Sequence, residues 1–312
     1  MTAVDRAIIE AVVLGTVGGL ISVQIVLRRL PFFTLAMTHA TFPGVVLAAI
    51  AGINLYAGGG LFGVLIVLGI LALSRRREQD TTTAIGVMLS AGFALGVVLL
   101  SAQSGFSKDL SAYTVGQIFT VGDSDLVAVA VVGVLVVALL GVAGRQLTFR
   151  AFDPGGYAAA GYRPTVIDIA LLLTVEAVIV VAVPAVGAIL AVTILVAPAA
   201  TARLWTHRIP AITAVAVLTG STGGLIGVLV SNSYDVAAGG AITVVTGALF
   251  TLSLAVTTAR RARVSRRRSG SRGSVPPLPD RHRGTRRDVP PALPCIGHMS
   301  EKRKLLSIRR DR

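Results

Sequence analysis

Two ionisable side chains lie deep inside long apolar runs of this 312-residue sequence. His39 stands within 34–44, where three threonines and a Pro-Gly pair interrupt the apolar pattern, and Glu176 stands in the middle of a later run. Hydrocarbon offers no hydrogen-bond partner to an imidazole or a carboxylate, so burying either in lipid is costly. We therefore expect both side chains to face other helices or a water-filled path.

The two residue types together suit a divalent transition metal. A neutral imidazole binds Zn²⁺, Mn²⁺ or Fe²⁺, and a carboxylate complements it. His39 is predicted to line a translocation path and offer a nitrogen to a passing ion, with Glu176 as the candidate second metal ligand. The alternatives are a helix-to-helix hydrogen bond for His39, and for Glu176 a structural pairing with Asp168 or a hydroxyl. Asp168 and Glu10 are nearer the ends of their runs, where they can reach the membrane interface.

The composition indicates that membrane helices position these residues. The chain is 54% hydrophobic and 14% charged, whereas a soluble domain carries about 25% charged residues. Its apolar runs are continuous rather than alternating, which predicts an all-α polytopic bundle of eight or nine transmembrane helices and not a barrel. The least regular are the second, which is polar, and the seventh, which is short and contains a proline. The predicted spans are 7–27, 34–53, 55–73, 84–102, 126–144, 165–183, 186–202, 210–230 and 236–258.

Basic residues follow every second predicted span. Arg28 and Arg29 follow the first, 75–77 the third, and further arginines the fifth, the seventh and the ninth. Because cytoplasmic loops carry an excess of Lys and Arg, the pattern predicts an outside amino terminus, nine crossings and a cytoplasmic carboxyl terminus. An eight-span version would need one irregular segment to be re-entrant.

The longest cytoplasmic connection between spans, 145–164, mixes apolar, aromatic and basic residues. Asp153-Pro154 is a helix-start signal, since Asp can cap a helix and Pro suits its first turn. We expect a short amphipathic helix on the membrane surface; the alternative is a plain loop.

The segment 259–312 carries most of the net charge of +14 and is rich in Arg, Ser, Gly and Pro. We divide the chain into a transmembrane domain, 1–258, and a basic, disordered cytoplasmic tail, 259–312, that attracts anionic membrane lipids. Nucleic acid is not an expected partner, because no folded module or interleaved aromatic residues accompany the charge.

Catalytic motifs are absent from the sequence. It contains no GxxxxGK[ST] loop, no HExxH and no GxSxG, so we expect a transport subunit that is not an enzyme and binds no cofactor. If ATP drives transport, a separate ATPase must hydrolyse it. A proton-coupled secondary transporter without an ATPase remains an alternative, with His39, Asp168 and Glu176 as its proton relay.

Four stretches, in order along 7–258, resemble the permease subunits of bacterial ABC importers for zinc and manganese. The first is MTHATFPGVVLA after Leu27-Arg28-Arg29, and the second is DTTTAIG leading into SAGFALGVVLLS, with YTVGQI after it. The third is AFDPGGYAAAGY. The fourth runs from VGAIL to APAATAR.

The resemblance implies a homodimer that is joined to an ABC ATPase subunit and served by an extracellular metal-binding protein, which would dock near 103–124 and 231–235. It implies that His39 faces the metal path. It also implies that Asp153, Pro154 and Gly161 belong to a coupling helix that seats in the ATPase.

One position departs from the family pattern. The family usually has Asp four residues before the histidine, on the same helix face, and this chain has Leu35. A site without that carboxylate is less anionic and should hold a divalent ion more loosely. Glu176 is the candidate for the missing charge; transport of a metal chelate is the alternative.

Overall fold

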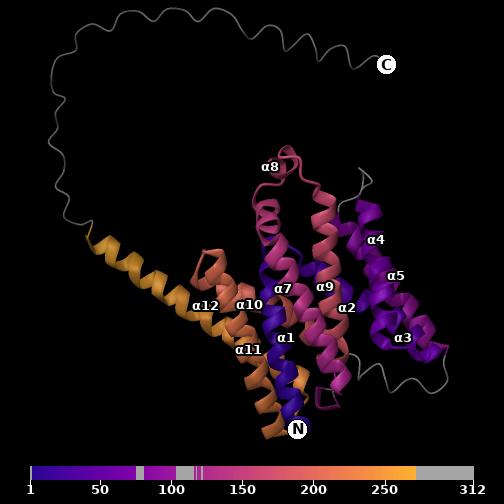
Figure 1. The fold of residues 1–312 in the computed structure, drawn as a ribbon. Helices are drawn as coiled ribbons and strands as arrows, with labels where there is room; N and C mark the ends of the chain where they lie inside the picture. The colour runs from indigo at the N-terminus through magenta and orange to yellow at the C-terminus, as the bar shows by residue number, and fades with distance from the viewer. Residues whose placement is uncertain (1, 75–80, 103–115, 117, 121, 272–312) are drawn as a thin grey trace, which may run out of the picture. The chain divides into compact units, whose positions relative to one another are not determined.

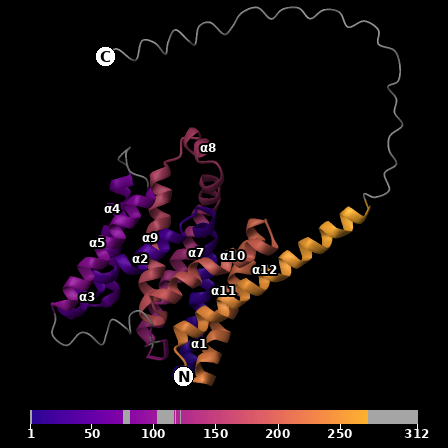
Figure 2. The same ribbon diagram turned by 180° about the vertical axis from the view of Figure 1, so that it is seen from behind.

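The computed structural model describes residues 2–74, 81–102, 116, 118–120 and 122–271, with side chains described up to residue 261. The chain divides into two compact units, Met1–Arg263 and Val264–Arg312. The first unit is a helical bundle (Figures 1 and 2). Its helices are α1 (Ala3–Leu27), α2 (Pro31–Ala40), α3 (Phe42–Ala51), α4 (Leu55–Ser74), α5 (Thr81–Ser101), the 3₁₀ turn η2 (Ile118–Thr120), α7 (Asp123–Phe152), α8 (Pro154–Ala159), α9 (Pro164–Val186), α10 (Ala188–Trp205), α11 (Ile209–Tyr234) and α12 (Ala238–Ser271, which continues into the second unit).

Within the described residues, nine helical segments are long and apolar enough to cross a membrane, with α2 and α3 counted together as Pro31–Ala51. The prediction of an all-α polytopic bundle is confirmed, and each predicted apolar run corresponds to one of these segments. The predicted division at 258 stays a prediction. Most of the predicted tail, 272–312, lies outside the described residues.

The centre of the bundle is α1, which packs against α11, α10 and α7. Small residues let α1 and α11 approach closely, as in many membrane helix pairs. A methyl group added at Gly15 would meet the backbone carbonyl of Gly220, and one added at Gly19 would lie 2.7 Å from the Ala216 carbonyl oxygen. The seam therefore has no room for larger side chains.

The second span is broken into α2 and α3 at Thr41. The hydroxyl of Thr41 donates to the Met37 carbonyl oxygen at 2.9 Å, and Pro43 lies in the first turn of α3. Proline lacks an N–H and suits the first turn of a helix. The break thus lies two residues before Pro43, where a proline is expected to end the preceding helix.

The fifth span extends further than its apolar run. α7 continues to Phe152, whereas the predicted span ends at residue 144. Polar residues end the apolar run without ending the helix. The predicted connection 145–164 is therefore reduced to α8 and its short flanks.

Candidate metal path and coupling surface

His39 lies on the side of α2 that the described residues cover least. Leu35 and Phe32, one and two turns earlier on that side, are each 40% exposed, and His39 is partly exposed. The opposite side of α2 is buried, and α2 as a whole packs against α5, α9 and α10. The imidazole therefore points toward the edge of the protomer, and not into its packed core.

The ring of His39 has one described aromatic neighbour, Phe93 of α5. The two ring centroids are 5.8 Å apart at an interplanar angle of 80°, an edge-to-face contact. α5 comes this close because Gly92 packs on α2: a methyl group there would lie 2.9 Å from the Ala40 carbonyl oxygen. The small-residue stretch around Gly92 thus sets the position of Phe93 beside His39.

The threonines near His39 do not contribute free ligands. The Thr38 hydroxyl donates to the Leu35 carbonyl oxygen at 2.8 Å, and Thr41 bonds the α2 backbone in the same way. Such local bonds are the usual role of Thr in a helix. The imidazole is therefore the polar group that α2 presents at this edge.

Glu176 lies in the middle of α9 and is 2% exposed. Neither carboxylate oxygen has a hydrogen-bond partner among the described residues. The side chain lies against Gly63 of α4, where an added methyl group would collide with it. The alternative of pairing with Asp168 or a hydroxyl is not realised.

His39 and Glu176 are not joined in the protomer. His39 packs against α5 and Glu176 against α4, and no hydrogen bond or ion pair between them is found in the described part of the chain. Nor do the described residues contain a group of three or more His, Cys, Asp or Glu able to hold a metal ion. A complete metal site is therefore not formed by these residues of one protomer.

Glu10 differs from its expected place at the interface. It is fully buried, and both carboxylate oxygens lack a partner among the described residues. Nearby at the same end of α1, Tyr56 donates to Asp125 at 2.7 Å. Spacing along the sequence gives no signal for this burial.

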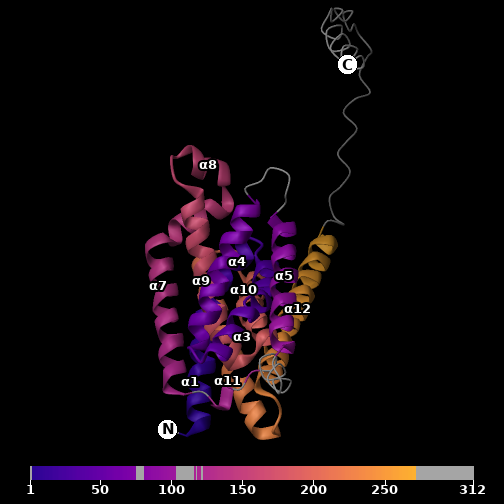
Figure 3. The ribbon, with the colours of Figure 1, turned by 90° about the vertical axis from the view of Figure 1, so that its right-hand side faces the viewer.

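α8 lies at the end of the bundle opposite the amino terminus (Figures 1 and 3). Asp153 caps it, since its Oδ1 accepts a 2.8 Å bond from the Gly156 N–H, and Pro154 is its first residue. Gly161, just after the helix, has a φ of 81°, a conformation in which a side chain would be strained. The helix-start signal is confirmed, and all three predicted coupling residues are exposed.

A single buried anchor holds α8 against the bundle. Tyr157 is 2% exposed; its ring stacks on Tyr162 at 4.9 Å and meets Phe149 of α7 edge-on at 5.6 Å. Its hydroxyl also donates to the Gln146 side chain at 3.4 Å. Among the described residues, α8 is thus fixed through Tyr157, and most of its other side chains are exposed.

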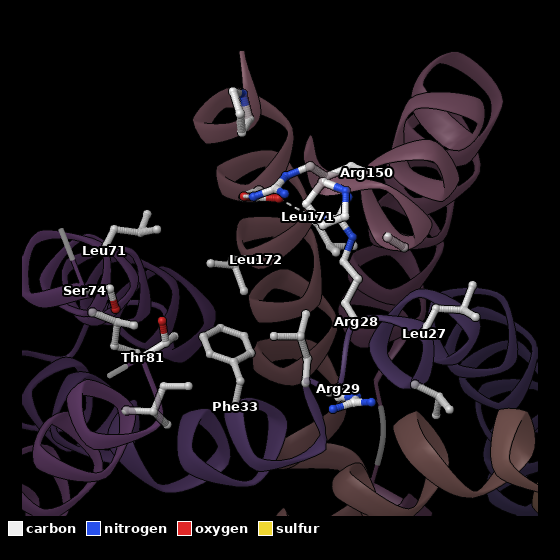
Figure 4. Close-up of a pocket in the computed structure, with 18 of the residues that line it drawn as sticks. Leu27, Arg28, Arg29, Phe33, Leu71, Ser74, Thr81, Arg150, Leu171 and Leu172 are labelled. Carbon is white, nitrogen blue, oxygen red and sulfur yellow. Dashed lines mark hydrogen bonds and ion pairs between the residues drawn. The ribbon is translucent and has the colours of Figure 1, made fainter. Parts of the chain in front are cut away.

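Near α8, a cleft of about 940 Å³ opens among α1, α2, α4 and α9 (Figure 4). At its edge Arg28 and Arg150 both bind Asp168, at 2.5 Å and 3.1 Å. Arg29 and Arg203 also line the cleft. Burial is the main influence on the pKa of Arg28 and lowers it, while the Asp168 carboxylate opposes that shift.

The comparisons with known proteins decide the family. The model of the ABC 3 transport family matches residues 1–257. The chain belongs to the ABC 3 transport family.

Relatives and a solved structure agree with this assignment. The chain is 33% identical over 249 residues to the manganese transport system membrane protein MntC of Halalkalibacterium halodurans, covering 80% of this chain and 85% of that one. It is 31% identical over 237 residues to the zinc transport system membrane protein TroC of Treponema pallidum, covering 72% and 80%. The structure of PsaBC from Streptococcus pneumoniae in complex with Fab matches with a TM-score of 0.74 and 30% identity, over 81% of this chain and 91% of that one.

The resemblance stated from the sequence is therefore confirmed at the level of family and fold. The ABC 3 match ends at residue 257 and leaves out the basic segment after it. The sequence reasoning missed the Arg28–Asp168–Arg150 cluster, because Arg28 and Asp168 are 140 positions apart. The sequence signal for this cluster is the presence of the basic residues themselves, and these residues also indicate which loops are cytoplasmic.

Proposed function

We propose that this ABC 3 protein is the membrane permease of an ATP-driven importer of a divalent transition metal ion, zinc or manganese. In this proposal it works as a homodimer, is served by an extracellular metal-binding protein and couples to a separate ATPase. The chain itself hydrolyses no ATP. The observation that carries the proposal is the partly exposed imidazole of His39 at the edge of the protomer.

In this proposal a second copy of the chain packs over the exposed side of α2. An imidazole facing lipid is disfavoured, yet His39 is bordered by the exposed apolar residues Leu35 and Phe93. Two such edges facing each other would enclose a path lined by a histidine from each protomer. This arrangement also supplies ligands that a single protomer lacks.

The cleft inside the protomer is a poor alternative route for a cation. Four arginines and one aspartate line it, Arg28, Arg29, Arg150, Arg203 and Asp168. Like charges repel strongly where the dielectric constant is low, so a divalent cation would be excluded. The electrostatics therefore favour a path along the edge of α2.

Glu176 is proposed as the second functional group. A buried carboxylate without partners is costly to keep, and a cation reaching it would supply the missing partner. Because Leu35 replaces the family's usual Asp, we assign to Glu176, among the acids of the spans, the negative charge that the metal site would otherwise lack. The names of the relatives include manganese, zinc and iron transport systems, so they do not choose between the metals.

The orientation follows from α8 and the basic residues. Arg28, Arg29 and Arg203 lie at the same end as α8, and the positive-inside rule assigns that end to the cytoplasm. The amino terminus is then outside and the carboxyl terminus cytoplasmic, in the cell membrane. The exposed side of α8, with Asp153, Pro154 and Gly161, would be the surface that the ATPase contacts.

The test is metal uptake by cells or vesicles that depend on this permease. His39→Ala is expected to lower uptake about tenfold or more, since even residues that only support metal ligands are worth 10–100-fold in affinity. His207→Ala is the matched control, because His207 is exposed between α10 and α11. Normal uptake by His39→Ala at equal membrane levels would exclude the ligand role.

A secondary transporter is distinguished by the energy source. Vesicles that contain the purified chain alone should show no uptake driven by a proton gradient. Uptake without an ATPase would favour the proton-coupled alternative.

A further inference from the structure

Arg28, Arg150 and Asp168 form a three-residue cluster, here called the clasp. Arg28 Nη1 donates to Asp168 Oδ1 at 2.5 Å, and Arg150 Nη2 donates to Asp168 Oδ2 at 3.1 Å. Arg28 Nη2 also donates to the Leu147 carbonyl oxygen at 3.2 Å. Asp168 of α9 and the Leu147 carbonyl of α7 therefore both hold Arg28, the residue that follows α1. Arg28 and Arg150 lie close together at the cleft (Figure 4).

The clasp connects directly to the support of α8. Tyr157 anchors α8 on Gln146 and Phe149 of α7. The Leu147 carbonyl that receives Arg28 lies between these two anchor residues in sequence. A displacement of α8 that moves this turn of α7 must therefore move the acceptor of Arg28.

The clasp also connects to α2, through a turn of three residues. Leu30 N–H donates to the Ile25 carbonyl of α1 at 2.9 Å, and the Leu30 carbonyl accepts the Thr34 N–H of α2 at 3.0 Å. Arg29, which lies between Arg28 and Leu30 in this turn, has a φ of 58°, so the turn adopts a strained left-handed conformation. Arg28 thus borders a tight connection that fixes where α2 begins.

His39 lies eight residues beyond Pro31, the first residue of α2. This separation is about 12 Å along a helix. α8 packs on α7 and α9, and the clasp is where both of these helices grip the α1–α2 turn. The Nε groups of Arg28 and Arg150 are buried without hydrogen-bond partners among the described residues. The hydrogen-bonding groups of the clasp are therefore not all paired in this arrangement. A second arrangement of the same side chains could pair them differently.

We propose that the clasp transmits movement of α8 to α2, so that Asp168 acts as a positioning residue that links ATP hydrolysis to the exposure of His39. This inference rests on the proposed function. The pairs are partly buried, with 10–29% of the side-chain surface accessible. Their value lies in joining three helices at one carboxylate.

The test measures metal ions transported per ATP hydrolysed by the permease in complex with its ATPase, reconstituted in vesicles. Asp168→Asn keeps the shape of the side chain and removes its charge. The ratio is expected to fall about fivefold or more, within the usual range of coupling between sites, while ATP hydrolysis continues. Asp168→Glu, which retains the charge, should recover part of the ratio.

The matched control is Asp5→Asn. Asp5 is also an aspartate with a structural bond: its Oδ2 accepts a 2.8 Å bond from the Thr2 N–H at the start of α1, far in sequence from α8. The variant should leave the transport ratio unchanged. If Asp168→Asn and Asp5→Asn both give the same ratio as the unaltered complex, the clasp does not transmit movement.

A second variant covers the case in which Asp168→Asn fails to assemble. Arg150→Gln leaves the Arg28–Asp168 pair in place and should lower the ratio to a smaller extent. A complex that loses ATP hydrolysis and transport in equal proportion in both variants would show a purely structural role. Absence of any metal transport by the unaltered complex would instead overturn the proposed function.

Discussion

Glu176 allows a prediction in which stability and function change in opposite directions. Its carboxylate is 2% exposed and has no partner among the described residues. A buried polar group left unsatisfied costs about 1–3 kcal/mol. Glu176→Met removes that group and fills a similar volume with a flexible apolar chain, so the free energy of unfolding should rise by about this amount.

The expected shift in melting temperature is about 2–4 °C for each kcal/mol in a chain of this size. It is measured on the purified protein in detergent. In vesicles, the same variant should lose metal uptake about tenfold or more, because the carboxylate that would meet the cation is gone. A stabilised protein that no longer transports identifies a group kept for function.

Glu10→Met is the control for this experiment. Glu10 is likewise buried without a partner in the described part of the chain, and no role in transport is assigned to it. It should be stabilised to a similar extent and should keep its uptake. If Glu176→Met instead lowers the melting temperature and transports normally, the carboxylate is a structural group and our reading of it is wrong.

Two further predictions concern the packing of the bundle and the cap of α8. Gly15→Ala should destabilise the bundle by about 1–3 kcal/mol through overpacking at the α1–α11 seam. Gly141→Ala, where the added methyl group meets open space, should leave stability unchanged. Thermal unfolding compares the two variants, and equal melting temperatures would contradict the close approach of α1 and α11. Asp153→Ala removes the cap of α8, worth about 1 kcal/mol, and should reduce co-purification of the ATPase, whereas Asp153→Asn can still cap the helix and should not. Equal ATPase yields with Asp153→Ala and Asp153→Asn would show that the cap of α8 does not contribute to ATPase binding.

The membrane helices could be predicted from the sequence because their physical cause is local. A continuous apolar run of about 20 residues is enough to identify a span. The ends were less certain, as α7 shows: Arg145 and Arg150 end the apolar run, yet the helix continues to Phe152. Leaving the hydrocarbon core and ending a helix are separate events.

The site was predictable only in part. A histidine inside a span signals function by its cost, and Leu35 together with His39 marks one side of α2. Which side the protomer leaves uncovered depends on packing against α5 and α9, which are far away in sequence. The Arg28–Asp168 pair, the burial of Glu10 and the separation of His39 from Glu176 likewise follow from tertiary packing.

The central claim is that the side chain at position 39 faces a water-filled path. The chain has one cysteine, Cys295, so Cys295→Ser provides a background in which His39→Cys can be labelled selectively, with Val134→Cys, 70% exposed in the middle of α7, as the lipid-facing control. In membranes, a charged, water-soluble thiol reagent should modify position 39 and not position 134. If both positions react only with a lipid-soluble maleimide, the histidine does not face a water-filled path and the account fails.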